Sequence, residues 1–397
     1  MGQRRGALTS RVLERRLWGD SPLFLLDVGC SGGIESRWRP FGDRLRAVGF
    51  DPLIAEVDRL NAANTHPGIQ YEAAFVTSRE YDQLFPPELR NDSVASRNNQ
   101  PFERSSAAAV LHRMPVSYIQ QVFNAGAPVA LTDRTITLDE YIPVNEHSRV
   151  DFVKIDTDGH DIEVILGAHG IFSASGVIGL TVEAQFHGAT HEYANLFSNI
   201  DRIVRQHGFS LFDLQSHRYS RAALPAPFVK DMTAQTISGQ MFWGEALYFR
   251  DLGAKDYELM WPYEITAERV MKLACLFELF ELPDCAAELL LNRGDFIDAE
   301  TRESLLDLLT SGAPGSYRAH IAAFEEDHTQ FFQSRMTNSP VLSGELSIEQ
   351  QAQERLARLT HKNTRLREKL QVQANRLDWM AKRVEELKAK RTRKTSG

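Results

Sequence analysis

Residues 23–33, LFLLDVGCSGG, begin as an apolar run and end in glycines. The six residues from Leu23 to Val28 are almost all apolar, which is typical of a parallel strand buried on both faces of a sheet. Gly29, Gly32 and Gly33 then let the backbone turn sharply and approach a ligand closely. The pattern predicts a central strand with a small-molecule site at its carboxyl end.

The residues that follow alternate between strand and helix patterns. RAVGFDP (46–52) and IQYEAAFV (69–76) have the composition of strands, and residues 53–64 between them repeat apolar side chains at helical spacing. Further strands are expected at 150–156, 177–186, 209–215 and 241–251, and further helices at 161–168 and 192–208. This alternation predicts an α/β fold with a doubly wound, Rossmann-like sheet.

The remaining segments divide the chain into candidate domains. Residues 77–135 and 217–240 are irregular, and residues 265–328 are helical in pattern. We expect an N-terminal basic helix at 1–22, the sheet domain at 23–251, a small helical domain at 252–335, a linker at 336–346, a coiled coil at 347–390 and a basic tail at 391–397.

Composition and charge narrow the class of protein. The chain has 397 residues, 43% of them hydrophobic, and a formal net charge of -8. Residues 351–397 hold 14 Lys and Arg against 5 Asp and Glu, so an acidic body precedes a basic tail. Cys30, Cys275 and Cys285 are too scattered for a zinc site or a disulfide framework, which favours a cytoplasmic protein. We expect no transmembrane segment, because no apolar run reaches about 18 residues, and no nucleic-acid partner, because the body is acidic.

The glycine turn has the wrong spacing for a dinucleotide. The fingerprint G-x-G-x-x-G fails because Gly29 is followed by Cys30, Ser31 and Gly32. Asp51 stands 24 residues after Asp27, at the end of the next predicted strand, where a carboxylate can accept both ribose hydroxyls of an adenosine. These residues favour S-adenosylmethionine, which has that ribose but no pyrophosphate. The candidate cofactor-binding residues are Asp27, Gly29, Ser31, Gly33 and Asp51.

Five segments resemble the FkbM family of S-adenosylmethionine-dependent methyltransferases. They are LLDVGCSGG, GFDP, TITLDEYI, VDFVKIDTDGHDIEVILGA and TVEAQF, and they span about residues 23–250. The resemblance implies a class I methyltransferase fold at 23–251 and an O-methyltransferase acting on a sugar, glycan or other small hydroxylated acceptor. Ser31 and Asp158 depart from the family, which usually has Asn and Glu at these positions.

Methyl transfer requires a base beside the acceptor oxygen. The carboxyl ends of the strands expected at 150–156 and 177–186 supply the catalytic candidates Asp156, Asp158, His160, Glu183 and His187. Asp156 is the strongest of them. Asp158 could instead cap the next helix together with Asp161. Three of the carboxylates could also hold a divalent cation, but we favour catalysis without a metal.

Two other sets of polar residues call for an interpretation. Lys154 lies in an apolar strand and must find a carboxylate, for which Asp27 and Glu183 are the natural partners. The polar segments at 91–106 and 217–221 supply acceptor-binding candidates, although a solvated loop surface explains them equally well; these candidates are Arg97, Asn98, Arg218, Tyr219 and Arg221.

The tail carries a heptad repeat from Leu356 to Leu387, with eight of its ten a and d positions apolar. Asn363 at an a position favours a parallel dimer, but the flanking g and e positions are mostly basic and would repel each other. We therefore expect weak self-association and an acidic helical partner, or a tail helix packed on its own acidic body. A scaffold that keeps the methyltransferase fold and acts through this tail is the alternative to an enzyme.

Overall fold

The structure, a computed structural model, describes residues 6–80, 131–157, 159–174, 176–186, 192–219, 235–236, 239–310 and 316–328. The chain divides into two units, Met1–Tyr317 and Arg318–Gly397. The first unit holds the sheet and the helices packed on it. Helix α15 (Tyr317–Glu326) begins at the last residue of the first unit and continues into the second. The linker, coiled coil and basic tail expected from the sequence lie outside the described residues.

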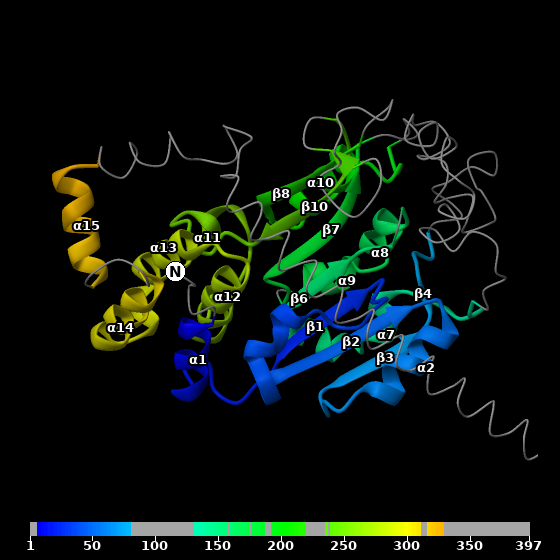
Figure 1. Cartoon of the computed structure of the whole chain (residues 1–397), viewed down its shortest axis with the longest axis horizontal. Helices are drawn as coiled ribbons and strands as arrows, with labels where there is room; N and C mark the ends of the chain where they lie inside the picture. The colour runs from blue at the N-terminus through cyan, green and yellow to red at the C-terminus, as the bar shows by residue number, and fades with distance from the viewer. Residues whose placement is uncertain are drawn as a thin grey trace, which may run out of the picture. The chain divides into compact units, whose positions relative to one another are not determined.

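An eight-stranded mixed sheet is the centre of the first unit (Figure 1). Its strands lie in the spatial order β3 (Ile69–Ala73), β2 (Leu45–Asp51), β1 (Leu23–Val28), β6 (Phe152–Ile155), β7 (Gly179–Gln185), β10 (Gln240–Phe249), β8 (Ser210–Tyr219) and β9 (Gln235–Thr236). The strands from β3 to β7 are parallel, and β10 runs antiparallel to both β7 and β8. The predicted α/β fold with a mainly parallel sheet is therefore confirmed.

Two strands differ in extent from the sequence prediction. The strand expected at 69–76 is two strands, because Phe75 N–H turns to the carbonyl of Arg134 (2.9 Å) and starts the pair β4 (Phe75–Val76) and β5 (Thr135–Ile136). Strand β8 continues through His217–Tyr219, a segment that the sequence assigned to an irregular stretch. Pairing with β10 and with the short β9 supplies the backbone hydrogen bonds that extend it.

Helices on one face of the sheet close the first hydrophobic core. Side chains of Phe24, Leu26 and Val28 point to this face and pack with the helices that follow β5, β6 and β7. These helices are α7 (Leu138–Tyr141), α8 (Asp161–Leu166), α9 (His169–Ser173) and α10 (Phe197–Arg205), with the 3₁₀ helix η3 (Val144–Arg149) between them. Helix α2 (Ile54–Ala63) connects β2 and β3.

The opposite face is covered by elements from both ends of the first unit. The helices are α1 (Ala7–Glu14), the 3₁₀ helix η1 (Ser36–Arg44), α11 (Tyr257–Met260), α12 (Ala267–Leu279), α13 (Pro283–Asn292), the 3₁₀ helix η4 (Gly294–Phe296) and α14 (Ala299–Leu309). Leu23 and Leu25 of β1 share one buried cluster with residues of α12, α13 and α14. Phe280, just after α12, stacks on Phe152 of β6 with 5.3 Å between ring centroids. The sheet and helices α12 to α14 thus have a common core, and the domain boundary expected at residue 252 stays a prediction.

A buried ion pair ties α12 to the sheet. Lys272 donates to the carboxylate of Asp151 (2.9 Å) and to the carbonyl of Pro22 (2.9 Å), and Asp151 also accepts the Phe24 N–H (2.8 Å). Both side chains are almost fully buried. This contact fixes α12 against the amino ends of β1 and β6, at the edge of the sheet opposite the carboxyl ends of these strands.

Within the described residues, none of the helices combines the length and the apolarity that crossing a membrane requires. Cys30, Cys275 and Cys285 are free thiols in the structure.

Candidate functional site

The carboxyl ends of four parallel strands bring the predicted site residues together. The order β2, β1, β6, β7 places Asp51, Gly29, Asp156 and Glu183 along one edge of the sheet. In an open α/β sheet, ligands bind beyond this edge. The sequence prediction that these residues share an edge is therefore confirmed, while their roles stay predictions.

The glycine turn after β1 is held tightly between its two neighbouring strands. Gly29 has a φ of 83°, and a Cβ built on it would lie 1.7 Å from the carbonyl oxygen of Asp156. The N–H groups of Gly29 and Cys30 both donate to the carbonyl of Phe50, at 2.9 and 3.1 Å. Only glycine fits at position 29, because any side chain would push β1 and β6 apart.

The rest of the turn is ordered by α2 and β3. Gly32 N–H donates to the Glu56 carboxylate (2.9 Å), and Ile34 N–H donates to the Tyr71 hydroxyl (3.2 Å). Gly33 has a φ of 88° and lies close to Tyr71. Ser31 is exposed at the tip of the turn. The turn therefore presents its tip to solvent on a fixed backbone.

Asp51 ends β2 beside this turn and is 7% exposed. One of its carboxylate oxygens accepts the Leu53 N–H (2.8 Å). Burial raises the pKa of Asp51, and the Leu53 N–H opposes that effect. A hydroxyl donor from a ligand would compensate this desolvation.

Asp27, near the end of β1, is the most buried acid of the site. It is 1% exposed, and its Oδ1 accepts from Lys154 Nζ (3.2 Å). Its Oδ2 has no hydrogen-bond partner among the described residues. Burial raises the pKa of Asp27 to about 6, although Lys154 opposes the shift.

Lys154 joins Asp27 to Asp156. Its ammonium lies 3.2 Å from Asp27 Oδ1 and 3.4 Å from Asp156 Oδ2. Burial alone would lower the pKa of Lys154, but the two carboxylates raise it above its ordinary value. Asp27 is thus the partner that the sequence predicted, and the second partner in the structure is Asp156.

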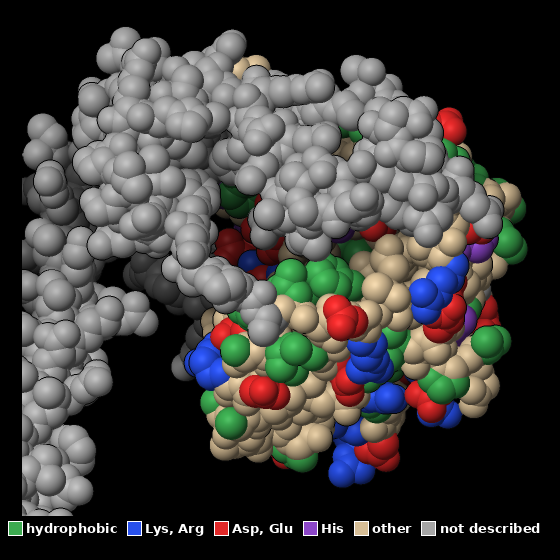
Figure 2. Space-filling view, turned by 90° about the vertical axis from the view of Figure 1, so that its right-hand side faces the viewer, with side chains coloured by type: hydrophobic (Ala, Val, Ile, Leu, Met, Phe, Trp, Pro, Cys, Tyr) green, Lys and Arg blue, Asp and Glu red, His purple; other side chains and the backbone are tan. Residues whose placement is uncertain are grey.

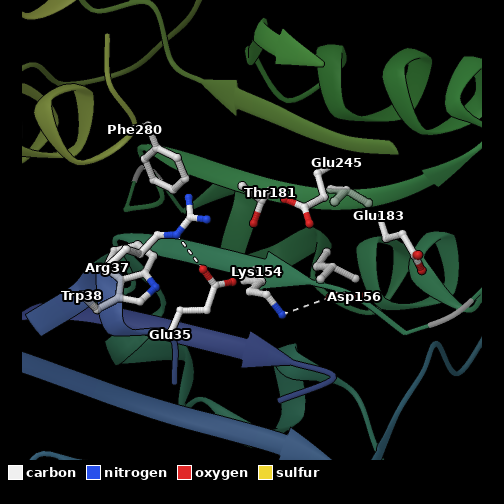
Figure 3. Close-up of a pocket in the computed structure, with 11 residues that line it drawn as sticks. Glu35, Arg37, Trp38, Lys154, Asp156, Thr181, Glu183, Glu245 and Phe280 are labelled. Atoms are coloured by element: carbon white, nitrogen blue, oxygen red, sulfur yellow. Dashed lines mark hydrogen bonds and ion pairs between the residues drawn. The ribbon is translucent and has the colours of Figure 1, made fainter. Parts of the chain in front are cut away.

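A pocket opens on the sheet face next to this ion-pair cluster (Figure 3). It encloses about 350 Å³ of empty space, and Lys154, Asp156, Thr181, Glu183 and Glu245 come to it from three adjacent strands. Its other walls are Glu35, Arg37, Trp38, Ile155, Val182 and Phe280. Within this wall, the Glu35 carboxylate accepts a hydrogen bond from Arg37 Nε (2.6 Å).

The pocket includes residues that the sequence analysis missed. Trp38 comes from η1, Glu245 from the antiparallel strand β10, and Phe280 from the end of α12. These three residues meet at the pocket because of tertiary packing. In the sequence, only the apolar character of Trp38 and Phe280 indicates burial. No spacing in the sequence links them to the glycine turn.

His160 lies at the start of α8, four residues after Asp156 in the sequence. Its Nδ1 is 3.0 Å from Glu163 Oε1, and Glu163 Oε2 accepts from the Thr77 hydroxyl (3.1 Å). His160 Nε2 is buried and has no hydrogen-bond partner among the described residues. His160 itself occupies the N-cap position of α8, so the alternative role of Asp158 as the N-cap is wrong. Asp161 instead accepts from Thr157 N–H and from its hydroxyl, both at 3.0 Å.

Two further predicted site residues lie at the same edge but farther along the sheet, because β8 runs parallel to β7 with β10 between them. Arg218 and Tyr219 end β8, and Arg218 donates to the Gly239 carbonyl (3.2 Å). Five residues lie outside the described ranges: Arg97, Asn98, Asp158, His187 and Arg221. In the described parts of the chain, there is no group of three or more His, Cys, Asp or Glu side chains that could hold a metal ion.

Figure 2 shows the charge distribution on the side of the molecule where α2 lies. Acidic and basic side chains of the described residues are interspersed there, with hydrophobic side chains between them.

A mainly parallel α/β sheet, with a glycine turn and buried acids at its carboxyl edge, defines a class of protein that binds a nucleoside-containing cofactor. Within that class, residues 104–211 match the family described as the methyltransferase FkbM domain. The resemblance to FkbM methyltransferases is therefore confirmed over this range, and residues 23–33 precede it. No curated protein matches the sequence.

Solved structures of methyltransferases resemble the chain at low similarity. A putative S-adenosylmethionine-dependent methyltransferase from Listeria monocytogenes aligns with 10% identity and a TM-score of 0.30, over 61% of this chain and 97% of that chain. Magnesium protoporphyrin IX methyltransferase from Synechocystis PCC 6803, solved with bound S-adenosylmethionine, aligns with 12% identity and a TM-score of 0.26, over 62% and 80%. The 1,6-didemethyltoxoflavin-N1-methyltransferase of Burkholderia thailandensis, solved with bound 1,6-didemethyltoxoflavin and S-adenosylhomocysteine, aligns with 12% identity and a TM-score of 0.24, over 62% of this chain and 78% of that chain.

Proposed function

We propose that the chain is an S-adenosylmethionine-dependent O-methyltransferase that acts on a sugar, a glycan or another small hydroxylated acceptor. One observation carries the proposal: two buried carboxyls, Asp27 and Asp51, flank a glycine turn at the carboxyl edge of the sheet. The match to the methyltransferase FkbM domain supports methyl transfer as the class of reaction. Three free thiols support a reducing cytoplasm as its location.

The residues at this edge fit such a cofactor. Asp51 has a carboxylate oxygen beyond the one that accepts Leu53 N–H, and it can accept the ribose hydroxyls. Asp27 Oδ2, buried and without a partner among the described residues, suits the ammonium of the methionine part. Gly29 keeps the turn close to β6, and Gly32, where a Cβ would meet nothing within 4 Å, leaves open space at the turn. Bound S-adenosylmethionine supplies an electrophilic methyl group on its sulfonium.

The protein must then align the acceptor hydroxyl and remove its proton. Asp156 is our candidate base, since its half-exposed carboxylate lines the pocket and is oriented by Lys154 at 3.4 Å. His160 is the second candidate, because Glu163 fixes its Nδ1 and leaves Nε2 for a proton. A scaffold without catalysis is not favoured, since burying Asp27 and Asp51 is costly for a protein that binds nothing there.

Calorimetric titration with S-adenosylmethionine tests the cofactor site. Asp51→Ala should weaken binding about tenfold or more, because one hydrogen-bonded carboxylate contributes about 1.5–3 kcal/mol. Asp58→Ala is the matched control, since Asp58 is an exposed aspartate on α2, outside the candidate site. Equal affinity in the wild type and Asp51→Ala would refute the assignment of Asp51.

Transfer of a labelled methyl group to fractionated cell glycans tests the reaction. Asp156→Asn should keep its affinity for the cofactor and lose about two to four orders of magnitude in turnover, the usual effect of losing a general base. Unchanged turnover would assign the proton transfer to another group. Label in lipid, protein or nucleic-acid fractions alone would exclude a glycan acceptor.

A further inference from the structure

The pocket continues into a much larger recess over β7, β10 and β8. The recess has about 1780 Å³ of empty space when the open solvent above it is included, and it shares Glu35, Arg37, Thr181, Glu245 and Phe280 with the pocket. Asp51 and the glycine turn lie at the ends of β2 and β1, on the far side of Asp27 from the recess. A cofactor held there leaves the recess as the space for the acceptor.

Acidic side chains dominate the walls of this combined recess. The acids are Glu35, Asp156, Glu183, Asp213, Glu245, Glu278 and Glu281, against the bases Arg37, Arg39 and Lys154. Several acids are already engaged: Glu35 with Arg37, Asp156 with Lys154, and Glu278 with the first N–H groups of α1. The carboxylate of Glu245 has no hydrogen bond or ion pair with the described residues.

Trp38 provides an independent indication of a ligand. It is 1% exposed, and its indole N–H has no hydrogen-bond partner among the described residues. Trp38 lines the same pocket as Thr181 and Glu245, and in Figure 3 its indole nitrogen is turned toward Glu35 at that pocket. A buried N–H without an acceptor is costly, and an oxygen atom of a ligand would satisfy it.

We propose that the recess selects a hydroxylated acceptor that also carries a protonated amine, and that Glu245 binds this ammonium group. This inference rests on the proposed function and specifies its substrate class. The Trp38 N–H donates to a hydroxyl or ether oxygen of the same molecule. Asp156 lies two strands away from Glu245, about 10 Å at the usual strand spacing, a separation that a short oligosaccharide can span between its amine and its reacting hydroxyl.

The electrostatics around Glu245 agree with this role. The pKa of Glu245 is raised, first by desolvation and then by the negative charges of Asp156 and Glu35. Arg37 and Lys154 oppose the shift only in part. An ammonium group placed among these carboxylates relieves their mutual repulsion, whereas an anionic acceptor would increase it.

The test compares two titrants that share their ring hydroxyls and differ in charge. These are the glucosamine trimer and its N-acetylated counterpart, each titrated calorimetrically at pH 6 with and without S-adenosylhomocysteine. The full chain should bind the amine at least about tenfold more tightly than the acetylated trimer, the value of one charge-assisted contact. Added salt should reduce the difference.

Glu245→Gln should abolish this preference, while Glu288→Gln, which removes an exposed charge on α13 outside the recess, should keep it. Equal affinity for the two trimers, no measurable binding of the amine, or a preference that survives in Glu245→Gln would each overturn the inference. S-adenosylhomocysteine binding, measured in the same titrations, reports on the proposed function separately.

Discussion

The positions of Asp27 and Gly29 at the edge of the sheet can be predicted from the sequence. Parallel strands end at a common edge, so a carboxylate and a glycine at the end of β1 must lie beside the end of β2 and of β6. The same rule placed Asp51 and Asp156. Glu245 could not be found this way, because its strand is antiparallel and its position depends on the insertion of β10 between β7 and β8.

The raised pKa of Asp27 predicts how cofactor binding depends on pH. An ammonium ligand binds the ionised carboxylate, and the Asp27 pKa of about 6 means that this form is lost as the pH falls through 6. Affinity for S-adenosylmethionine should therefore fall about tenfold between pH 7 and pH 5, because the ionised fraction of the Asp27 carboxyl falls by about that factor. Titration calorimetry across this range measures the effect.

Asp27→Asn provides the control for that pH dependence. It should bind more weakly at pH 7 and show a smaller change down to pH 5, because the titrating carboxyl is gone. A change of equal size in Asp27→Asn would assign the dependence to another group, such as Asp51, whose pKa is also raised.

At the scale of elements, strands were easier to predict than the helices that cover them. The strands at 23–28 and 45–51 are buried apolar runs, which fixes their type and nearly their ends. The element after the glycine turn is a 3₁₀ helix with Pro40 inside it and a kink at Gly42. Its position over β6, which brings Trp38 to the pocket, follows from aromatic packing of Trp38 with Phe152 and Phe280 rather than from a local pattern.

The contact of α12 with the sheet predicts a large effect on stability. Lys272→Met should reduce the free energy of unfolding by about 3–5 kcal/mol, because it leaves the Asp151 carboxyl buried without its cation. The double variant Lys272→Met and Asp151→Asn should recover part of that loss, since no charge then remains buried. Urea unfolding measures both.

Lys255→Met is the matched control for this ion pair, since Lys255 is exposed in the segment before α11. It should change the free energy of unfolding by less than about 0.5 kcal/mol. If Lys272→Met were as stable as this control, the ion pair would not hold α12 on the sheet.

At the scale of the whole molecule, the sheet and helices α12 to α14 share a buried core, while the separate helical domain expected at residues 252–335 stays a prediction. The helical pattern of these residues led to that expectation, and in the structure Leu273 and Leu276 belong to the same buried cluster as Leu25 and Phe249 of the sheet. Local periodicity reports which face of a helix is apolar and not what that face meets. By contrast, the heptad tail has a seam of its own in which eight of the ten a and d positions are apolar.

The tail supplies a prediction about association of the whole chain. Residues 347–390 lie outside the described part of the structure, and the expectation comes from their heptads alone. The apolar a and d seam favours pairing, whereas the mostly basic g and e positions repel an identical helix. Salt screens that repulsion and leaves burial of the seam unchanged.

The full chain should therefore be largely monomeric at low ionic strength and self-associate increasingly as salt is added. Sedimentation measures this, with a chain ending at residue 335 as the control that should stay unchanged. A tight dimer that does not depend on salt, or equal association of the shortened chain, would contradict the expected acidic partner for the tail.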